Sequence, residues 1–379
     1  MYRKIYKGEV SGCMKKRIRI YRTCLVGMLI ATVMFTVYYA NNVIKLDITK
    51  GLEDNNNIVR SVSESELDEL RVLPLGMQIG VYLETEGVLV AATSSITGAD
   101  GMNYEPVLNK IYEGDYIVKL NNIDVSSKSQ LLFLINKYGS KDLVLTVRRN
   151  NEEFDVLVTP VKTANNEYKI GVWARDDTQG IGTLTYVTEN GEFGALGHGI
   201  NDVDTNELLS SNNGLLYKAE IWGITKGQNG SPGGLCGSID YEKSNELGVI
   251  SRNCDKGIFG TINESCLDEM KDLYGEDYYE VAEKKEVHKG KAEIISCISG
   301  ESTRYEIEIV EIKGDENSNK SIVLVVTDAK LLELTNGIVQ GMSGSPIIQD
   351  GKIIGAVTHV LVNDPTRGYG IFIEDMLKH

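Results

Sequence analysis

The sequence has few residues of the kinds that hold metals or nucleotides. Only four histidines occur in 379 residues, and the H-E-x-x-H motif is absent, which excludes the zinc peptidases that use this motif. A glycine-rich phosphate loop and a dinucleotide-binding fingerprint are also missing. These absences exclude the corresponding metallopeptidases, nucleotide hydrolases and dehydrogenases, and we expect no cofactor and no metal.

Basic residues are concentrated in the first 23 positions. The formal charge of the chain is −15. Residues 1–23 hold a cluster of Lys and Arg in which Glu9 is the acidic exception, so the rest of the chain is more acidic than the total indicates. Proteins that bind nucleic acid neutralise phosphates with clustered Lys and Arg. The composition therefore argues against a nucleic-acid partner and favours a solvated acidic surface.

Residues 24–44 form one long uncharged segment. As a helix it would be about 31 Å long, enough to cross a hydrocarbon core of about 30 Å. The basic residues before it and the acidic ones after it predict a cytoplasmic segment 1–23, a transmembrane signal anchor 24–44 and a body on the extracytoplasmic side. A cleaved signal peptide is the alternative, although Tyr38 stands where a cleavage site ending at Ala40 needs a small residue. The polar residues 45–70 predict a spacer.

The cysteines beyond this segment do not define a disulfide framework. Four of them could pair in three ways or remain as thiols, and their spacing fits neither a zinc ribbon nor a C-x-x-C redox site. These cysteines are Cys236, Cys254, Cys266 and Cys297.

Residues 71–162 combine short strand-like segments with one helix-period segment around Ser129 to Tyr138. The stretch "EGDYIVKLNNIDV" resembles a PDZ motif, with Asn122 where glycine is usual. The resemblance implies a PDZ domain that binds a peptide carboxylate through a loop and pairs the peptide with the next strand, Met77 to Leu83. A PDZ fold that packs on its neighbour and binds no free peptide is the alternative. The loop expected to bind the carboxylate consists of Leu73, Pro74, Leu75 and Gly76.

Residues 165–379 are rich in glycine-punctuated strand-like segments such as "IGTLTYV", "GIFGTI" and "GKIIGAVTHVLV". Many short strands with few helical periods predict one all-β barrel or a pair of barrels. The acidic stretch that begins with "ESCLDEMKDLYG" is the exception, and we expect a partly helical surface insertion there.

The stretch Gly341-Met-Ser-Gly-Ser-Pro346 has the pattern G-x-S-G-x-P of chymotrypsin-type serine proteases. Such a tight turn directs the N–H groups of Gly341 and Ser343 to one point, where a tetrahedral oxyanion can be held. Serine is a weak nucleophile until a base is placed beside it. Taken alone, the motif fits a glycine-serine hairpin as well as a catalytic Ser343.

His198 is the best candidate for that base, because small residues flank it in "GALGHGI". His288 and the terminal His379 lie in settings that predict exposure to solvent. His359 could lie inside the barrel or beside the site. A structural histidine in a turn is the alternative interpretation of His198.

The acidic partner of the histidine is the least defined member of the set. Asp328 ends an apolar strand-like segment fifteen residues before Ser343, where its carboxylate could fix the imidazole tautomer. It could equally be the N-cap of a short helix starting at Ala329. Asp202, Asp204 and Asp364 are the rivals.

Several segments together resemble the SpoIVB (stage IV sporulation protein B) peptidase family, a group of proteins with a PDZ domain and a chymotrypsin-like protease domain. They are "FGALGHGI", "VVTDAKLLELTNGIVQGMSGSPIIQDGKIIGAVTHV" and "VNDPTRGYGIFIEDML". The resemblance implies a mainly β architecture: an N-terminal transmembrane helix, a PDZ domain and a chymotrypsin-like β-barrel serine protease domain. It also implies a catalytic triad of Ser343, His198 and Asp328.

The same resemblance implies a signalling serine endopeptidase of sporulation. Its partners would be a membrane-bound regulatory protein, cleaved to release processing of a late sigma-factor precursor, and its own N-terminal region, cut in self-processing. The protein would be a single-pass membrane protein acting in the forespore intermembrane space and shed after self-cleavage. The alternatives are a non-catalytic PDZ-containing tether that binds exported peptides and a housekeeping quality-control protease.

Overall fold

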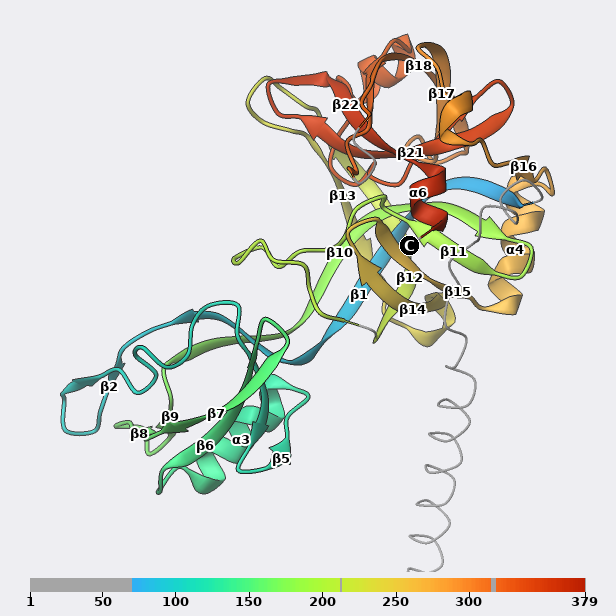
Figure 1. The fold of residues 1–379 in the computed structure, drawn as a ribbon. Helices are drawn as coiled ribbons and strands as arrows, with labels where there is room; N and C mark the ends of the chain where they lie inside the picture. The colour runs from blue at the N-terminus through green and yellow to red at the C-terminus, as the bar shows by residue number, and fades with distance from the viewer. Residues whose placement is uncertain (1–69, 212, 315–317, 379) are drawn as a thin grey trace, which may run out of the picture. The chain divides into compact units, whose positions relative to one another are not determined.

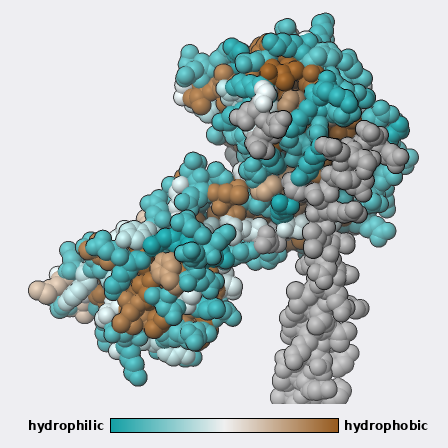
Figure 2. Space-filling model, in the orientation of Figure 1, coloured by the Kyte–Doolittle hydropathy of each residue, from teal (hydrophilic) through white to brown (hydrophobic). Residues whose placement is uncertain are grey.

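The computed structural model describes residues 70–211, 213–314 and 318–378 (Figure 1). The predicted basic segment 1–23, the predicted anchor 24–44 and residues 45–69 of the predicted spacer lie outside these ranges. Within the described ranges, no helix is long and apolar enough to cross a membrane. The face drawn in Figure 2 is largely hydrophilic, with hydrophobic side chains gathered in separate areas, in keeping with the charged composition.

Six strands form a ring that we call the first barrel. Strand β1 pairs with β10 on one side and with β12 on the other, which closes the ring. The strands in ring order are β1 (Arg71–Thr93), β12 (Asn213–Thr225), β14 (Glu246–Cys254), β15 (Gly257–Ile262), β11 (Glu192–Ala195) and β10 (Val172–Thr188). The ring surrounds a core of buried Leu, Ile, Val and Phe side chains, because residues on one face of each strand point inward.

Three elements extend the first barrel. Strand β13 (Gly234–Ile239) forms a hairpin with the distal half of β12, and β16 (Tyr279–Glu280) pairs with the start of β1. Helix α4 (Glu264–Tyr274) lies in the acidic stretch where the sequence predicts a helical insertion, and it buries Cys266, Leu267 and Met270 against the barrel core. A 3₁₀ turn, Lys243–Asn245, precedes β14.

The second barrel is a closed ring of six consecutive antiparallel pairings (Figure 1). Its strands in ring order are β17 (Gly290–Ser296), β18 (Thr303–Ile312), β19 (Ile322–Val326), β22 (Asp364–Phe372), β21 (Lys352–Leu361) and β20 (Pro346–Gln349). Helices α5 (Ala329–Thr335) and α6 (Ile373–Leu377) and the 3₁₀ turn Lys284–Glu286 accompany it. The barrel interior is filled by alternating Ile, Val and Leu side chains of these strands. The expectation of paired barrels agrees with this architecture.

The two barrels meet where β1 approaches the end of β17. The N–H of Cys297 donates to the Gly76 carbonyl at 2.9 Å. Gly76 has φ +64, and a Cβ at this position would lie 2.3 Å from the Ile295 carbonyl oxygen. Glycine is therefore required here, both by the left-handed backbone and by the close approach of the second barrel.

A smaller PDZ-like module is inserted between the barrel halves of β1 and β10. It contains the second half of β1 and the first residues of β10. Beyond a bulge at Glu84 to Leu89, β1 pairs with β4 (Tyr116–Leu120), and the sheet continues through β6 (Leu143–Arg149) and β7 (Glu152–Val158). Helix α3 (Lys128–Tyr138) packs on this sheet, starting at Ser127, whose hydroxyl accepts from the Gln130 N–H. Short pairs complete the module: β5 (Ile123–Asp124) with β4, β2 (Ile96–Thr97) with β3 (Asn103–Tyr104), and β8 (Val161–Lys162) with β9 (Tyr168–Lys169).

The module confirms the predicted helix, and Asn122, which stands where the PDZ motif usually has glycine, has φ 63. The predicted domain boundaries need correction. Residues 71–84, expected in the PDZ range 71–162, form the barrel half of β1, and the start of β10, expected in the peptidase range 165–379, pairs with the module half of β1. The module is thus an insertion in the first barrel and does not precede the peptidase fold.

Candidate active site

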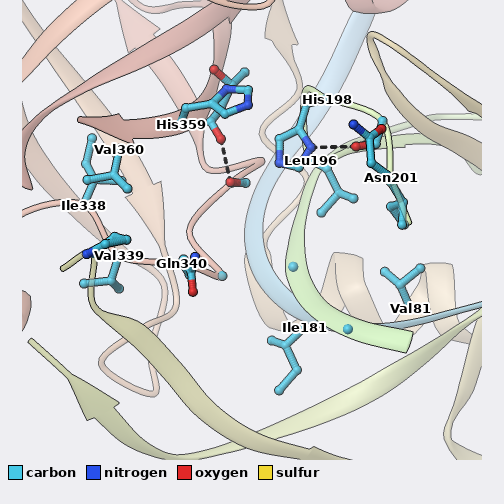
Figure 3. A pocket seen from close by; sticks show the side chains of 18 of the residues that line it. Val81, Ile181, Leu196, His198, Asn201, Ile338, Val339, Gln340, His359 and Val360 are labelled. Carbon is cyan, nitrogen blue, oxygen red and sulfur yellow. Dashed lines mark hydrogen bonds between the residues drawn. The ribbon is translucent and has the colours of Figure 1, made fainter. Parts of the chain in front are cut away.

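A cavity of about 530 Å³ lies between the two barrels and holds the two main candidate residues (Figure 3). Ser343 and His198 both line it, together with His359. Its other walls are mostly apolar and include Val81 and Ile181 from the first barrel and Ile338, Val339 and Val360 from the second.

Ser343 lies in the loop between α5 and β20, which we call the nucleophile loop (residues 340–345). Gly341 has φ +99 and Gly344 has φ +101, a conformation that glycine adopts without strain. A Cβ on Gly344 would lie 2.1 Å from the Thr183 carbonyl oxygen. Both glycines of the motif are therefore required by their positive φ, and Gly344 also by its contact with β10.

Hydrogen bonds fix the direction of each peptide unit in this loop. The carbonyls of Gln340, Gly341, Met342 and Ser343 accept from the Leu235 N–H (2.9 Å), the Thr183 hydroxyl (2.6 Å), the Ser345 N–H (3.0 Å) and the Thr183 N–H (3.1 Å), respectively. The N–H groups of Met342 and Gly344 donate to Val339 and Val357 carbonyls.

The two remaining N–H groups of the loop, those of Gly341 and Ser343, donate to no acceptor in the described part of the chain. In a trans peptide the N–H points away from the C=O, so the bonded carbonyls of Gln340 and Met342 set the direction of these two amides. They are the pair expected to form the oxyanion hole, and they are available to an incoming oxygen.

His198 follows β11 in a tight loop. Leu196 and Gly197 both have φ 70, and Cβ atoms on Gly197 and Gly199 would contact Thr358 of β21 at 2.9 Å and the Cys254 carbonyl oxygen at 2.6 Å. The small residues around His198 thus allow the loop to approach β21 and β14 closely.

The imidazole of His198 is held in one orientation. Its Nδ1 lies 2.9 Å from the Gly199 carbonyl oxygen (Figure 3). Because a carbonyl oxygen can only accept a hydrogen bond, Nδ1 must carry the proton. Nε2 is then the free acceptor, as a general base requires. Burial lowers the pKa of His198, and the positive charge of Lys320 lowers it further, against the opposing hydrogen bond to Gly199. The neutral form of the base is therefore favoured.

The hydroxyl of Ser343 donates to the Thr358 carbonyl at 2.7 Å. His359, the next residue of β21, places its ring 5.0 Å from the ring of His198. Its Nδ1 is buried with no hydrogen-bond partner among the described residues, and burial, with repulsion from His198, lowers the pKa of His359 to about 4. His359, whose place the sequence left open, lies beside the site as a neutral ring.

Comparison with known families agrees with this geometry. The model of the SpoIVB peptidase S55 family matches residues 166–377, more than half of the chain. The chain belongs to the SpoIVB peptidase S55 family. It is a serine peptidase, as the sequence predicted. No curated protein matches the chain.

Two solved structures are distantly similar to parts of this SpoIVB-family peptidase. The active form of the Rv3671c protease of M. tuberculosis is 13% identical and covers 52% of this chain and 71% of its own, with a TM-score of 0.28. The PDZ domain of an SdrC-like protein of Listeria monocytogenes is 13% identical and covers 24% of this chain and 87% of its own, with a TM-score of 0.20. Similarities this low carry no information on the site.

The structure does not place Asp328 in the triad that the family resemblance implies. Its carboxylate accepts from the N–H groups of Lys330 and Leu331, both at 2.9 Å, and so caps α5. Asp328 is not among the residues that line the cavity. The alternative interpretation of Asp328 as an N-cap is the one that the geometry supports.

The rival carboxylates are also engaged elsewhere. Asp202 and Asp204 both bind Arg175 at 2.7 Å, and Asp364 accepts from the Thr366 hydroxyl. No carboxylate in the described part of the chain bonds to His198. The Gly199 carbonyl occupies the position on Nδ1 that an aspartate has in a triad.

The prediction that Leu73, Pro74, Leu75 and Gly76 bind a peptide carboxylate is wrong. Leu73 and Leu75 are buried in the first barrel, and the segment Val72 to Ile79 pairs with β10. The predicted carboxylate-binding loop was wrong because an apolar strand after "LPLG" has the same sequence pattern in a barrel as in a PDZ domain.

The module has a different groove. A cavity of about 640 Å³ lies between α3 and the start of β10, lined by Leu132 and Ile135 of the helix and by Ile170 and Trp173. Residues Val172 to Ala174 of β10 pair with β1 on one side, and their other edge has no strand partner in the described ranges.

Two features of the site escaped the sequence analysis. One is Thr183 on β10, which bonds to the nucleophile loop twice. The other is a segment that we call the strap, residues 226–235, which comprises the β12–β13 connection and the first two residues of β13. In the strap, the Gly233 carbonyl accepts from the Gln340 N–H at 2.8 Å, and the Gly227 N–H donates to the Thr335 carbonyl. The four cysteines whose pairing the sequence left open are free thiols.

Proposed function

We propose that this SpoIVB-family peptidase is a membrane-anchored, self-processing signalling protease of sporulation that uses Ser343 as nucleophile and His198 as general base. The observation that carries the catalytic assignment is the meeting of Ser343, His198 and the two undonated amides of Gly341 and Ser343 at one cavity. A serine in a glycine turn, a histidine in a loop or an amide without an acceptor can each occur for structural reasons alone. Together they supply a nucleophile, a base and an oxyanion site.

The reaction follows from this geometry. The Ser343 hydroxyl rotates from the Thr358 carbonyl to His198, gives its proton to Nε2 and attacks the scissile carbonyl carbon. The resulting oxyanion is held by the amides of Gly341 and Ser343. His198 then returns the proton to the leaving amine, and an activated water cleaves the acyl-enzyme by the same route in reverse. The Gly199 carbonyl steadies the imidazolium in place of a carboxylate.

The biological assignment rests on family membership. We infer a membrane-bound regulatory protein as substrate, whose cleavage releases processing of a late sigma-factor precursor. The chain's own N-terminal region is the second substrate. The uncharged segment 24–44 supports a single-pass anchor with the body on the extracytoplasmic side, in the forespore intermembrane space, from which self-cleavage would release it.

Fluorophosphonate labelling with mapping of the modified residue tests the catalytic assignment. We expect labelling at Ser343, its loss in Ser343→Ala, and a large fall in rate in His198→Ala. His288→Ala is the matched control, since His288 is exposed and pairs with Asp350 away from the cavity. Labelling that persists in a folded Ser343→Ala variant would contradict the proposal, and a folded wild type that never labels would favour the non-catalytic tether.

The groove between α3 and β10 supports a second role, the binding of an exported peptide with a free carboxylate. The unpaired edge of β10 can add a strand, and the amides of Ile170 and Gly171, which donate to no described acceptor, precede that edge as a carboxylate-binding loop should. This assigns peptide binding to residues 168–174 instead of residues 73–83.

A pair of adjacent substitutions tests the groove. Leu132 lines the cavity and Phe133 does not, although both are exposed on α3. We expect Leu132→Glu to abolish capture of C-terminal peptides from a synthetic library, and Phe133→Glu to retain it. Equal binding by both variants would remove this role. Cleavage of generic unfolded protein by the wild type would instead favour the quality-control protease.

A further inference from the structure

One residue outside the nucleophile loop holds two of its peptide units. Thr183 is fully buried on β10. Its hydroxyl donates to the Gly341 carbonyl at 2.6 Å, and its N–H donates to the Ser343 carbonyl at 3.1 Å. These two bonds fix the peptide units that follow each of the two candidate oxyanion amides.

The same residue also contacts the histidine loop. The Thr183 carbonyl accepts from the N–H of Leu196 at 3.2 Å, two residues before His198. Thr183 therefore bonds both to the loop of the nucleophile and to the loop of the base. The first barrel supplies the base and the second supplies the nucleophile, and Thr183 connects the two.

The loop needs such a restraint from outside. Gly341 has φ +99, and glycine moves between positive and negative φ at little cost. The bond from the Leu235 N–H to the Gln340 carbonyl directs the Gly341 amide, but the backbone of Gly341 does not by itself fix the Gly341–Met342 peptide unit, which links that amide to the amide of Ser343. The hydroxyl of Thr183 acts on the carbonyl of Gly341 and opposes rotation of that residue.

We propose that Thr183 is a positioning residue for catalysis, which holds the peptide unit between the amides of Gly341 and Ser343 and so keeps these two amides in the relative orientation that stabilises the oxyanion. It acts through the loop and does not touch the substrate. The inference rests on the proposed role of Ser343 as nucleophile. Without the hydroxyl, the partly buried Gly341 carbonyl loses its partner, and the Gly341–Met342 peptide unit keeps, among the described residues, the bond from the Met342 N–H to Val339 alone.

The strand offers a matched control two residues away. Thr185 is also fully buried on β10, and its hydroxyl has no hydrogen-bond partner among the described residues. Thr183→Val and Thr185→Val make the same chemical change at the same depth in the same strand. Only the first removes a bond to the nucleophile loop.

The test measures inactivation by a fluorophosphonate, whose phosphonyl oxygen needs the same two amides. Misplacement of catalytic groups by about 1 Å costs about 10²-fold in rate. We therefore expect Thr183→Val to lower the limiting inactivation rate by about ten-fold to 10²-fold, with the half-saturating probe concentration changed less than about three-fold. Thr183→Ser keeps the hydroxyl and should restore the rate, and Thr185→Val should react like the wild type.

A purely structural role predicts a different pattern. If Thr183 only supports the fold, then Thr183→Val and Thr185→Val should react equally fast per folded molecule, and that result would overturn the inference. Thr183→Ala serves if the valine variant does not fold. An error in the assignment of Ser343 as nucleophile would give a different result, because the label would then map to a residue other than Ser343 in the wild type.

Discussion

His198 is kept ready to accept a proton by its surroundings alone. Burial disfavours the imidazolium and lowers the pKa, and the Gly199 carbonyl fixes the tautomer. The neighbouring ring of His359 is neutral because its pKa is about 4. His198 is therefore a neutral base with no carboxylate partner among the described residues. We expect the rate to fall at low pH, where His198 becomes protonated.

The lowered pKa of His198 predicts the acid limb of the rate profile. A base acts only when neutral, so fluorophosphonate inactivation should lose half its rate at a pH below the ordinary histidine value of 6.5. Lys320→Gln removes a charge that disfavours the imidazolium and should move this limb to higher pH. The exposed Lys330→Gln should not move it. A limb unchanged by Lys320→Gln would argue against this account.

Asp328 should behave as a helix cap and not as a triad member. Asparagine is also a good N-cap, so Asp328→Asn should keep the inactivation rate within a few-fold of wild type. A triad aspartate replaced by asparagine instead loses about 10⁴-fold. Asp328→Ala should lower the free energy of unfolding by about 0.5–2 kcal/mol, as measured by urea denaturation. A loss of activity in Asp328→Asn with intact stability would restore the triad.

At this scale, local patterns in the sequence singled out residues that the structure brings to one cavity. Ser343, His198 and Gly341 stand out because motif and small neighbours identify them. The role of Asp328 could not be decided from the sequence, because an aspartate before a helix fits both a triad member and an N-cap. Thr183 is invisible in the sequence, since it lies 158 residues from its partner Gly341 and resembles any threonine in a strand.

Among the elements, the strap has the most direct influence on the site. It pairs with Gln340 from both sides, through Gly233 and Leu235, and a Cβ on Gly341 would lie 2.8 Å from the Leu235 side chain. A connection within the first barrel thus supports the loop of the second barrel that carries the nucleophile.

Gly233 and Gly234, two adjacent glycines of the strap, differ in the space available for a Cβ atom. A Cβ on Gly233 would lie 2.1 Å from the Thr225 carbonyl oxygen, whereas a Cβ on Gly234 meets nothing closer than 3.8 Å. Gly233→Ala should lower the inactivation rate by about ten-fold or more and destabilise the fold by about 1–3 kcal/mol. Gly234→Ala should resemble the wild type in both measurements. Equal effects would show that the strap does not support the site.

The sequence located most elements but not their pairing. Glycine-punctuated strands and the helix at Lys128–Tyr138 follow from local patterns. In contrast, the sequence predicted short strands of one PDZ domain over Arg71–Thr93, whereas the structure has one strand whose pairing with β10 contains three register shifts. Local alternation does not reveal partners in residues 172–188, about a hundred positions later.

For the molecule as a whole, the barrel half of β1 sets a limit on N-terminal trimming. Residues 72–84 pair with β10, and residues 79–84 pair with β12 as well. A chain starting at residue 70 should label and unfold cooperatively, as judged by thermal denaturation. A chain starting at residue 85 should not form the first barrel and should not be labelled by the fluorophosphonate. An active product lacking residues 71–84 would contradict this limit, and we expect the proposed self-processing to cut upstream of Arg71.

The paired positions of Glu84 and Asp177 show how little of the catalytic fold depends on what lies between them. From the viewpoint of the peptidase, the whole PDZ-like module is an enlarged hairpin turn whose two stems are already neighbours. A tight two-residue connection at this point would give a minimal enzyme, in which cleavage could be studied apart from recruitment.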